Sequence, residues 1–278
     1  MRHRLSDGQW AAIKGVFPEP AATGRPPKDR RDVMDAIIWL DNTGAKWRDL
    51  PDEFGPWRTV YGWFDKWNDD GTLQQIVDQL TRMAMGQAGV KHDLWCIDGT
   101  ILRAHRCAAG GGKKKDPDEP DDHALGRSRG GFTTKLHLLV TGSGLPLGFH
   151  LTGGQVHDST VLDSVMMTAN ELTDIDGNPI AWPVALGGDK GYRADWIDQY
   201  LLDLGIQPVI PSKANENRET RPVEFDRELY RQRNIVERVI GWLKEFRRVF
   251  SRFEKTAKNF GGMIRIAFIQ RYLRQITE

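Results

Sequence analysis

The stretch from Tyr230 to Phe250 constrains this chain most, because its composition and periodicity are those of a long helix. It lacks proline, and its only glycine is Gly241. At 100° per residue its apolar side chains form one broad arc that would face a core; they are Ile235, Val236, Val239, Ile240, Trp242, Leu243, Phe246, Val249 and Phe250. Four polar residues lie within about 60° on the other side: Tyr230, Arg233, Glu237 and Lys244. Such a stripe can hold one carboxylate at a cationic site.

The net charge of +1 over 278 residues conceals an uneven distribution. From residue 230 onward, 12 Lys and Arg stand against four acidic residues, which leaves +8 there and −7 in the rest. This block favours a polyanionic partner such as nucleic acid, although a solvated basic surface would have the same composition. No apolar run approaches the roughly 20 residues of a membrane span, and the first residues lack the apolar core of a signal peptide. We therefore expect an intracellular protein without a membrane partner.

Residues 1–90 are expected to form a separate helical domain. Apolar side chains recur with helical period over residues 33–40, and short helices follow one another through tight turns. This pattern resembles a helix-turn-helix unit, in which the helix at 56–68 would enter a DNA groove with Arg58 and Lys66 on its polar side. A helical bundle whose aromatic residues only form a core would show the same periodicity.

From residue 91 the pattern changes to alternating strands and helices, which predicts an α/β domain with a mixed sheet over residues 91–278. The expected strands are 94–97, a hairpin of 132–140 and 145–151, 184–186 and 207–211, with helices at 158–172 and 194–204. Residues 107–131 are rich in Gly, Lys, Asp and Pro and have almost no apolar side chain. This composition predicts a flexible loop.

Two aspartates, Asp98 and Asp189, follow two of the expected strands. Reacting groups collect at the carboxyl ends of strands in open α/β sheets, so the two should lie side by side, with Glu237 brought over them by the last helix. Three converging carboxylates require cations, and oxygen ligands without Cys or His select Mg²⁺ or Mn²⁺. Two such ions can activate a nucleophile and stabilise the leaving oxygen of a phosphodiester. A single strand-end aspartate is often only a turn or cap residue, so the prediction rests on the three together.

Four stretches of the sequence carry a family resemblance. They are residues 97–105 (IDGTILRAH), 188–192 (GDKGY), 46–67 (containing WRDLP and FGPWRTVYGWFDKW) and 230–244, which has the pattern Y-x2-R-x3-E-x6-K. Together they resemble a DDE-class insertion-sequence transposase of the IS5 group in the IS4-like superfamily. The resemblance implies an RNase H-like mixed sheet flanked by helices, preceded by an all-α, helix-turn-helix-like N-terminal domain.

The resemblance also implies activity, partners and site residues. The protein would bind the terminal inverted repeats of its element and cut and rejoin double-stranded DNA, as a homodimer in a synaptic complex, in the bacterial cytoplasm at the nucleoid. Asp98, Asp189 and Glu237 would be the catalytic triad that binds two Mg²⁺ or Mn²⁺ ions. Tyr230, Arg233 and Lys244 would contact phosphates near the scissile bond. Further DNA contacts are expected from Arg247, Arg248, Arg58, Lys66, Lys190 and His105.

Several points stay open at the level of sequence. Only 48 residues separate Asp189 from Glu237, so the strand-rich insertion that some relatives carry there is missing, and hairpin-forming excision is not implied. Solvent-facing or second-layer positions are favoured for Lys135 and His137, and loop or cap roles for His157 and Asp158. A nuclease without strand transfer and a catalytically silent DNA-binding regulator also fit. Three clustered carboxylates would repel DNA phosphate, which argues against the regulator.

Overall fold

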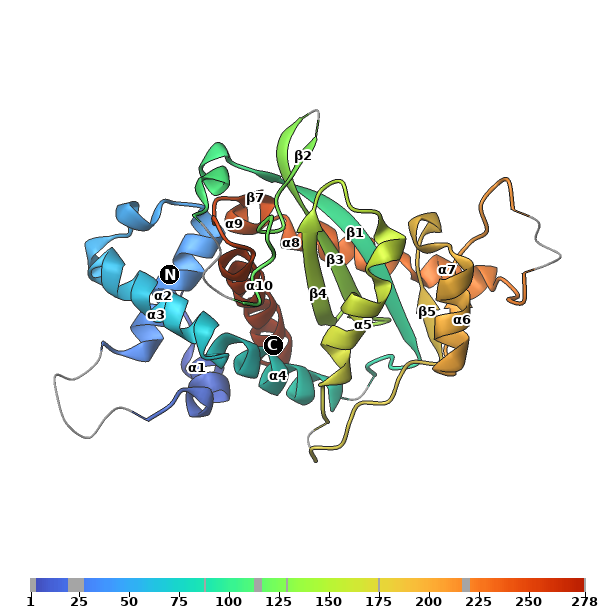
Figure 1. Cartoon of the computed structure of the whole chain (residues 1–278). Coiled ribbons are helices and arrows are strands. Elements are labelled where there is room, and N and C mark those ends of the chain that lie inside the picture. The colour runs from blue at the N-terminus through green and yellow to red at the C-terminus, as the bar shows by residue number, and fades with distance from the viewer. Residues whose placement is uncertain are drawn as a thin grey trace. The chain divides into compact units, whose positions relative to one another are not determined.

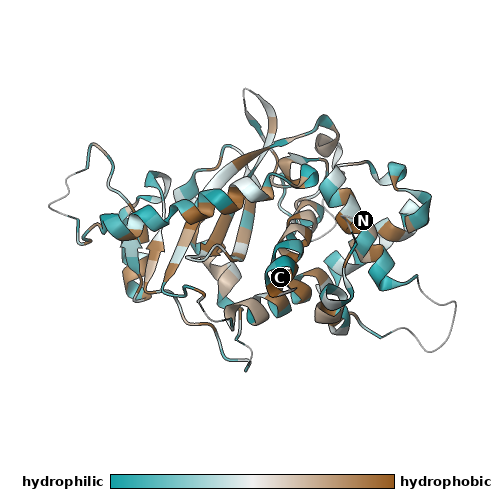
Figure 2. Ribbon diagram, turned by 180° about the vertical axis from the view of Figure 1, so that it is seen from behind, coloured by the Kyte–Doolittle hydropathy of each residue, from teal (hydrophilic) through white to brown (hydrophobic). Residues whose placement is uncertain are grey.

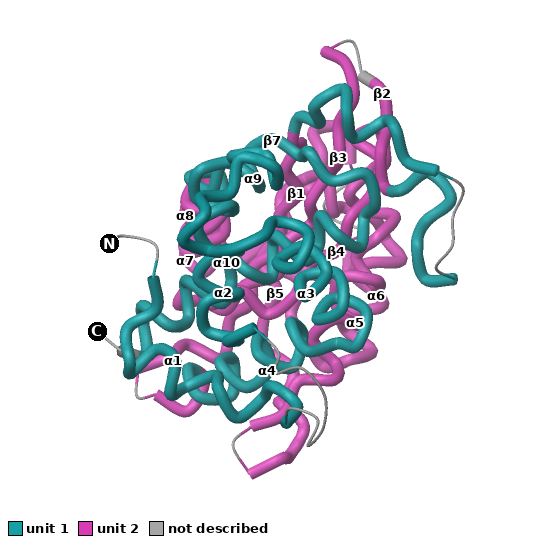
Figure 3. The backbone as a smooth tube through the Cα atoms, turned by 90° about the vertical axis from the view of Figure 1, so that its left-hand side faces the viewer, with its two compact units in different colours: residues 1–84, 103–123, 243–278 teal, residues 85–102, 124–242 magenta. Residues whose placement is uncertain are grey.

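The computed structural model describes residues 4–19, 28–87, 89–112, 117–128, 130–174, 176–216 and 221–277 (Figure 1). The chain divides into two compact units, shown in Figure 3. Unit 1 comprises residues 1–84, 103–123 and 243–278, and unit 2 comprises residues 85–102 and 124–242. Each unit therefore combines segments that are distant in sequence. The single domain boundary expected near residue 90 stays a prediction.

Unit 2 is built on a sheet whose strand order is β2-β3-β1-β5-β6, with β4 also paired to β3. The strands are β1 (Leu94–Ala104), β2 (Gly126–Ser128), β3 (Gly131–Thr141), β4 (Pro146–Gly153), β5 (Ala185–Gly187) and β6 (Gln207–Val209). β5 is parallel to both β1 and β6, whereas β3 and β4 form an antiparallel hairpin. This sheet confirms the expected mixed α/β class.

Helices complete the core of unit 2. Helix α5 (Leu162–Asn170) packs on β3 and β4, and α6 (Asp195–Asp203) and α7 (Arg227–Gln232) pack on β6. Helix α8 (Asn234–Leu243) meets the β3–β4 turn, where a Cβ added to Gly144 would lie 3.1 Å from Ile235 and 3.2 Å from Val239. As Figure 2 shows, the helices carry both hydrophobic and hydrophilic residues, as expected for elements with one buried face.

Unit 1 is mainly helical, which confirms the expected helical N-terminal region. Its helices are α1 (Asp7–Ile13), α2 (Arg30–Thr43), α3 (Trp57–Asp69), α4 (Thr72–Met85), α9 (Arg247–Phe250) and α10 (Ala257–Thr277). The sequence analysis does not predict α10, which packs against α1, α2 and α3. Apolar residues are buried around most of its circumference, including Phe260, Met263, Ile266 and Phe268. None of the described helices is long and apolar enough to cross a membrane.

The single helix expected from Tyr230 to Phe250 is wrong, because the structure divides this stretch into α7, α8 and α9. The chain is extended at Phe246, where ψ is 114°. On a continuous helix the side chains of Phe246 and Arg248 would point about 200° apart, yet both are buried. The break allows this, and it leaves Phe250, expected in the core, 58% exposed.

The flexible loop expected at residues 107–131 carries local structure over part of its described length. It contains part of a 3-10 helix (Arg106–Gly110) and strand β2, which the sequence analysis missed. The buried Glu119 carboxylate accepts hydrogen bonds from the backbone N–H groups of Ala257 (2.6 Å) and Lys258 (2.9 Å) at the start of α10. The composition of the segment could not reveal these hydrogen bonds of Glu119, because their donors lie some 140 residues further along the chain. Residues 113–116 and 129 of the predicted loop lie outside the described residues.

Candidate active site

Strand register brings Asp98 and Asp189 to the same part of the sheet. Cys96 of β1 is paired with Gly187 of the parallel strand β5, and each aspartate lies two residues beyond its member of this pair. Asp189 follows β5, as expected. Asp98 lies inside β1 rather than after it, because β1 continues to Ala104, where its last residues pair with β7 (Ser251–Arg252). The expected side-by-side placement of the two aspartates therefore follows from the register.

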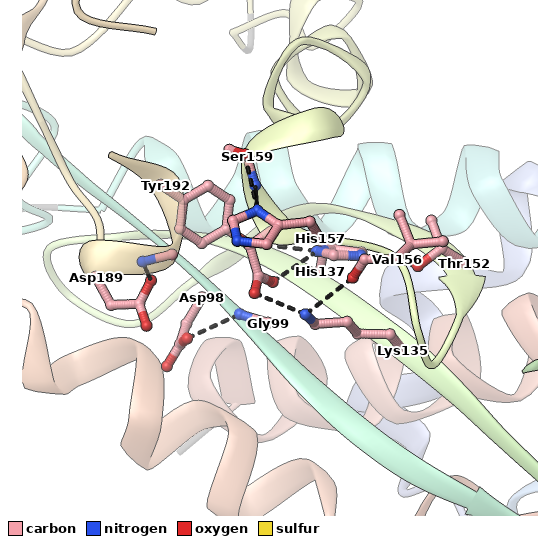
Figure 4. Close-up of polar contacts among 12 residues, drawn as sticks. Asp98, Gly99, Lys135, His137, Thr152, Val156, His157, Ser159, Asp189 and Tyr192 are labelled. Carbon is pink, nitrogen blue, oxygen red and sulfur yellow. Dashed lines mark hydrogen bonds and ion pairs between the residues drawn. The ribbon is translucent and has the colours of Figure 1, made fainter. Parts of the chain in front are cut away.

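Backbone donors orient both carboxylates. The Gly99 N–H donates to Oδ1 of Asp98, and the Gly191 N–H donates to Oδ1 of Asp189, each at 2.8 Å (Figure 4). Burial raises the pKa of Asp98, Arg233 lowers it, and the charge of Asp189 raises it again, with a net pKa above the ordinary value. Arg233 therefore offsets only part of the free-energy cost of burying the Asp98 charge, as expected for a site that binds a cation.

Glu237 is linked to Asp98 through one guanidinium. Arg233 lies between α7 and α8, four residues before Glu237, and its Nη1 is 3.3 Å from Oδ2 of Asp98. Its Nη2 forms an ion pair with Oε1 of Glu237, whose side chain is 52% exposed. Burial lowers the pKa of Arg233, but Asp98, Tyr230 and Glu237 outweigh this effect and raise it above its ordinary value. The described arrangement thus joins Arg233 to carboxylates, whereas its expected phosphate contact stays a prediction.

The donor set has the chemistry of a site for a hard divalent cation. The three acidic side chains offer only oxygen ligands, which suit Mg²⁺ or Mn²⁺. A cationic group already lies between Asp98 and Glu237, so this position accepts positive charge. However, no cluster of three or more His, Cys, Asp or Glu side chains close enough to share a metal ion occurs among the described residues. The three carboxylates are of the right chemical type for such a metal ion, but in this structure they do not surround one common position.

Most of the expected DNA-contact residues are accessible. On α3 of unit 1, Arg58 and Lys66 are exposed, and each stacks over a tryptophan ring. Arg247 in unit 1 and Lys190 beside Asp189 in unit 2 are exposed as well. His105 is exposed, with Nδ1 3.1 Å from Sγ of Cys107. Lys244 and Tyr230 are half-buried. These positions are compatible with DNA contact, which stays a prediction.

Arg248 is a correction to the expected DNA contacts. Its side chain is only 3% exposed, and its guanidinium is ion-paired with Glu254 and donates to the carbonyl of Ala45. The guanidinium also lies over the rings of Trp47 and Phe253, 5.4 and 5.8 Å from their centroids. Arg248 therefore stabilises the core of unit 1. The positive charge of Arg248 is visible in the sequence, whereas its burial is not.

Three further polar residues, Lys135, His137 and Asp158, form a cluster next to Gly99. From the sequence, only solvent-facing, second-layer, loop or cap positions were expected for them. His137 is fully buried and Lys135 is largely buried, so both occupy second-layer rather than solvent positions. Nζ of Lys135 donates to Oδ2 of Asp158 at 2.6 Å and to the Val156 carbonyl at 3.2 Å. Nδ1 of His137 is 3.3 Å from Oδ1 of Asp158, and its Nε2 is 3.0 Å from Oγ1 of Thr152 (Figure 4). The only sequence signal was that Lys135 and His137 share one face of a strand.

The charge state of Asp158 follows from these neighbours. Burial raises its pKa, but His137 and Lys135 more than offset this effect, so that the pKa lies below the ordinary value. The carboxylate is therefore ionised at neutral pH. His157, by contrast, is exposed, and its Nδ1 accepts from the backbone N–H of Ser159 at the start of a 3-10 helix, which confirms the expected cap role.

Comparisons with known proteins identify the family of this chain. Residues 90–270 match the family described as "Transposase DDE domain", and residues 5–77 match "Putative transposase of IS4/5 family (DUF4096)". The chain is 31% identical over 155 residues to the "Putative transposase for insertion sequence element IS402" of Burkholderia cepacia, which covers 56% of this chain and 67% of that protein. It is 30% identical over 143 residues to the corresponding IS6501 protein of Brucella ovis, which covers 51% of this chain and 100% of that protein.

Among solved structures, the pre-cleavage Mos1 transpososome is similar over 94% of this chain and 82% of that one, at 13% identity and a TM-score of 0.30. The family matches are the informative ones, because together they span most of the sequence. The chain belongs to the DDE transposases of insertion sequences, in the IS4/5 family. Its function is DNA transposition, and membership of this family implies dependence on a divalent metal ion.

Proposed function

We propose that this transposase binds the terminal inverted repeats of its element and catalyses cleavage and strand transfer at Asp98, Asp189 and Glu237. The observation that carries the proposal is the pairing of Cys96 with Gly187, because it brings Asp98 of β1 beside Asp189, which closely follows the adjacent parallel strand β5. Arg233 supports it by linking Glu237 to Asp98. The oxygen-only donor set of the three acidic side chains supports the metal dependence of this chemistry.

The cofactor in this proposal is a pair of Mg²⁺ or Mn²⁺ ions held by the three carboxylates. When bound, such ions activate the attacking oxygen and stabilise the leaving oxygen of a phosphodiester. For Glu237 and Asp98 to approach one ion, the Arg233 guanidinium must leave the position between them. The released guanidinium, with its planar set of donors, would then be free to bind phosphate oxygens, which is the role that the sequence predicts.

DNA binding is proposed to involve both units. In unit 1, Arg58 and Lys66 on α3 present exposed cations from the region proposed as the N-terminal DNA-binding domain, residues 1–90. In unit 2, Lys190 is exposed directly beside Asp189. Because two element ends must be brought together, we propose a homodimer in a synaptic complex, acting at the nucleoid in the bacterial cytoplasm.

The test is Mg²⁺-dependent cleavage of a supercoiled plasmid that carries the element's own ends. We expect Glu237→Ala to lower the cleavage rate by more than about 100-fold, since it removes a metal ligand, while binding of the ends in a mobility-shift assay is retained. Glu228→Ala is the matched control, because Glu228 is an exposed glutamate on the neighbouring helix that pairs with Arg231, and it should cleave as the wild type does.

Each result has a defined meaning. Cleavage by Glu237→Ala at the wild-type rate would show that the active site lies on other residues. Cutting by the wild type without joined products would favour the nuclease alternative. Specific binding of the ends by the wild type without any cutting would favour the regulator.

A further inference from the structure

We propose that Asp158, held by Lys135, is a positioning residue that sets the separation of the catalytic aspartates Asp98 and Asp189. This inference rests on the proposed function, since it concerns the same carboxylates. It goes beyond that proposal by giving a role to a fourth carboxylate, which lies outside the predicted triad. The Asp158 carboxylate closely approaches two glycines, Gly99 and Gly191.

The first glycine is Gly99, which follows Asp98 in β1. A Cβ added to Gly99 would lie only 2.1 Å from Oδ1 of Asp158 and 3.0 Å from Cε of Lys135. The Asp158 carboxylate therefore packs directly on the backbone that carries Asp98. The same Gly99 donates its N–H to Asp98, so a shift of this backbone would also move the catalytic carboxylate.

The second glycine is Gly191, two residues after Asp189. A Cβ added there would lie 3.2 Å from Oδ2 of Asp158. The Gly191 N–H donates to Oδ1 of Asp189 at 2.8 Å. One carboxylate thus contacts both backbone segments that orient the catalytic aspartates. Its two oxygens divide the contacts, Oδ1 toward Gly99 and Oδ2 toward Gly191.

Asp158 itself is fixed from the opposite side. Lys135 of β3 donates to its Oδ2 at 2.6 Å and to the Val156 carbonyl in the segment just before it. The buried His137, on the same strand, lies 3.3 Å from Oδ1, and the buried Tyr192 lies 3.4 Å from His137 through its hydroxyl. Side chains from β3 thereby hold a carboxylate against β1 and against the turn after β5.

The charge of Lys135 explains why a fourth carboxylate is tolerated here. The negative charges of Asp98, Asp189 and Asp158 would repel one another. However, Lys135 lies 2.6 Å from Asp158, and this ion pair is close to neutral. Neutralising Asp158 alone would leave the Lys135 ammonium uncompensated beside Gly99, where it would compete with a divalent cation for Asp98. Residues that orient metal ligands typically contribute about 10- to 100-fold to metal affinity when they are mutated.

The experiment measures Mn²⁺ affinity of the full-length protein without DNA, by electron paramagnetic resonance, together with cleavage of the plasmid described above. The isosteric variant Asp158→Asn should bind Mn²⁺ about 10- to 100-fold more weakly and cleave more slowly, with its mobility-shift affinity for the ends unchanged. Lys135→Met should also weaken Mn²⁺ binding. The double variant should be no weaker than Asp158→Asn alone, because the two residues act as a unit.

Asp198→Asn is the matched control. Asp198 is a buried aspartate of α6 in the same unit, and Arg221 donates to both of its oxygens at 2.7 and 2.8 Å. Its substitution also breaks a buried ion pair, so it should lower the thermal midpoint while leaving Mn²⁺ affinity as in the wild type. This control separates positioning of the metal ligands from general destabilisation.

Mn²⁺ affinity of Asp158→Asn within about threefold of the wild-type value would overturn the inference. If Asp158→Asn does not fold, Lys135→Met decides in the same way, since wild-type affinity in that variant would show that the pair does not position the ligands. Failure of the proposed function is recognised separately, by plasmid cleavage, since a Glu237→Ala variant that cleaves at the wild-type rate would overturn it whatever the Mn²⁺ affinity of Asp158→Asn.

Discussion

Replacing Gly99 by alanine should disable the site by adding a single methyl group. No φ in the left-handed range occurs at Gly99, so the backbone itself accepts alanine and the effect is purely steric. The new Cβ would lie 2.1 Å from Oδ1 of Asp158, whereas ordinary van der Waals contact begins at 3.4 Å. Either the Asp158 carboxylate or the β1 backbone must therefore move by about 1.3 Å.

This displacement translates into a large effect on rate. A misplacement of about 1 Å at a reacting centre can cost about 100-fold, and overpacking of this kind costs about 1–3 kcal/mol of folding stability. We therefore expect Gly99→Ala to remain folded, to bind the element ends, and to cleave about 100-fold more slowly. Because the substitution removes no carboxylate and changes no charge, the loss would come from geometry alone.

The assay is single-turnover cleavage of end-containing DNA at saturating Mg²⁺, with thermal denaturation and a mobility-shift assay on the same preparation. Gly241→Ala is the control, because Gly241 is an exposed helical glycine of α8 with no atom within 4 Å of the added Cβ. It should leave the rate unchanged and stabilise the protein by about 0.5–1 kcal/mol, as alanine does in helices. A Gly99→Ala variant that cleaves within about threefold of the wild-type rate would refute the steric reasoning.

Two further predictions concern stability. Glu119→Ala removes both side-chain acceptors at the start of α10 and should cost about 1–2 kcal/mol, measured as a lower midpoint in urea; an unchanged midpoint would contradict the capping role. Because the pKa of Asp158 is lowered in the folded state, its ionised form contributes stability that is present above its unfolded pKa and lost as the pH falls through the lower folded value. Asp158→Asn, studied in EDTA by thermal denaturation, should therefore be less stable than the wild type at pH 7, and the difference should shrink as the pH falls through the lowered folded pKa of Asp158; a difference that stays the same from neutral to acidic pH would count against this assignment.

The fold class could be predicted from local sequence patterns, because the preference for strand or helix depends largely on neighbouring residues. The apolar strand before Asp98 and the short apolar strand before Asp189 are visible as runs of residues, and both form as expected. The i, i+4 spacing of Arg233 and Glu237 predicts that they share a helix face, and they form an ion pair. The break at Phe246 was not visible, because it depends on which side chains unit 1 buries and not on local propensity.

Contacts between distant segments were decided only by tertiary structure. Lys135 and Asp158 are 23 residues apart, yet they meet at 2.6 Å because the β3–β4 hairpin returns the chain to the same edge. Arg248 and Lys66 are both basic residues in the sequence, but one is buried beside Glu254 and the other is exposed. The charge of a residue can be read from the sequence. Its burial and its ion-pair partners depend on which other segments pack around it, and the sequence does not show this directly.

The sequence by itself therefore determined the transposase family, the mixed α/β class and the three carboxylates proposed for catalysis. These depend on motifs whose spacing is local: an aspartate that follows an apolar run, or two residues four positions apart along the chain. Tertiary structure decided that Arg233 lies between Asp98 and Glu237 and that Asp158 packs against Gly99 and Gly191. The physical reason is that such contacts form only when the hydrophobic burial of whole elements brings distant polar groups within a few ångströms of one another.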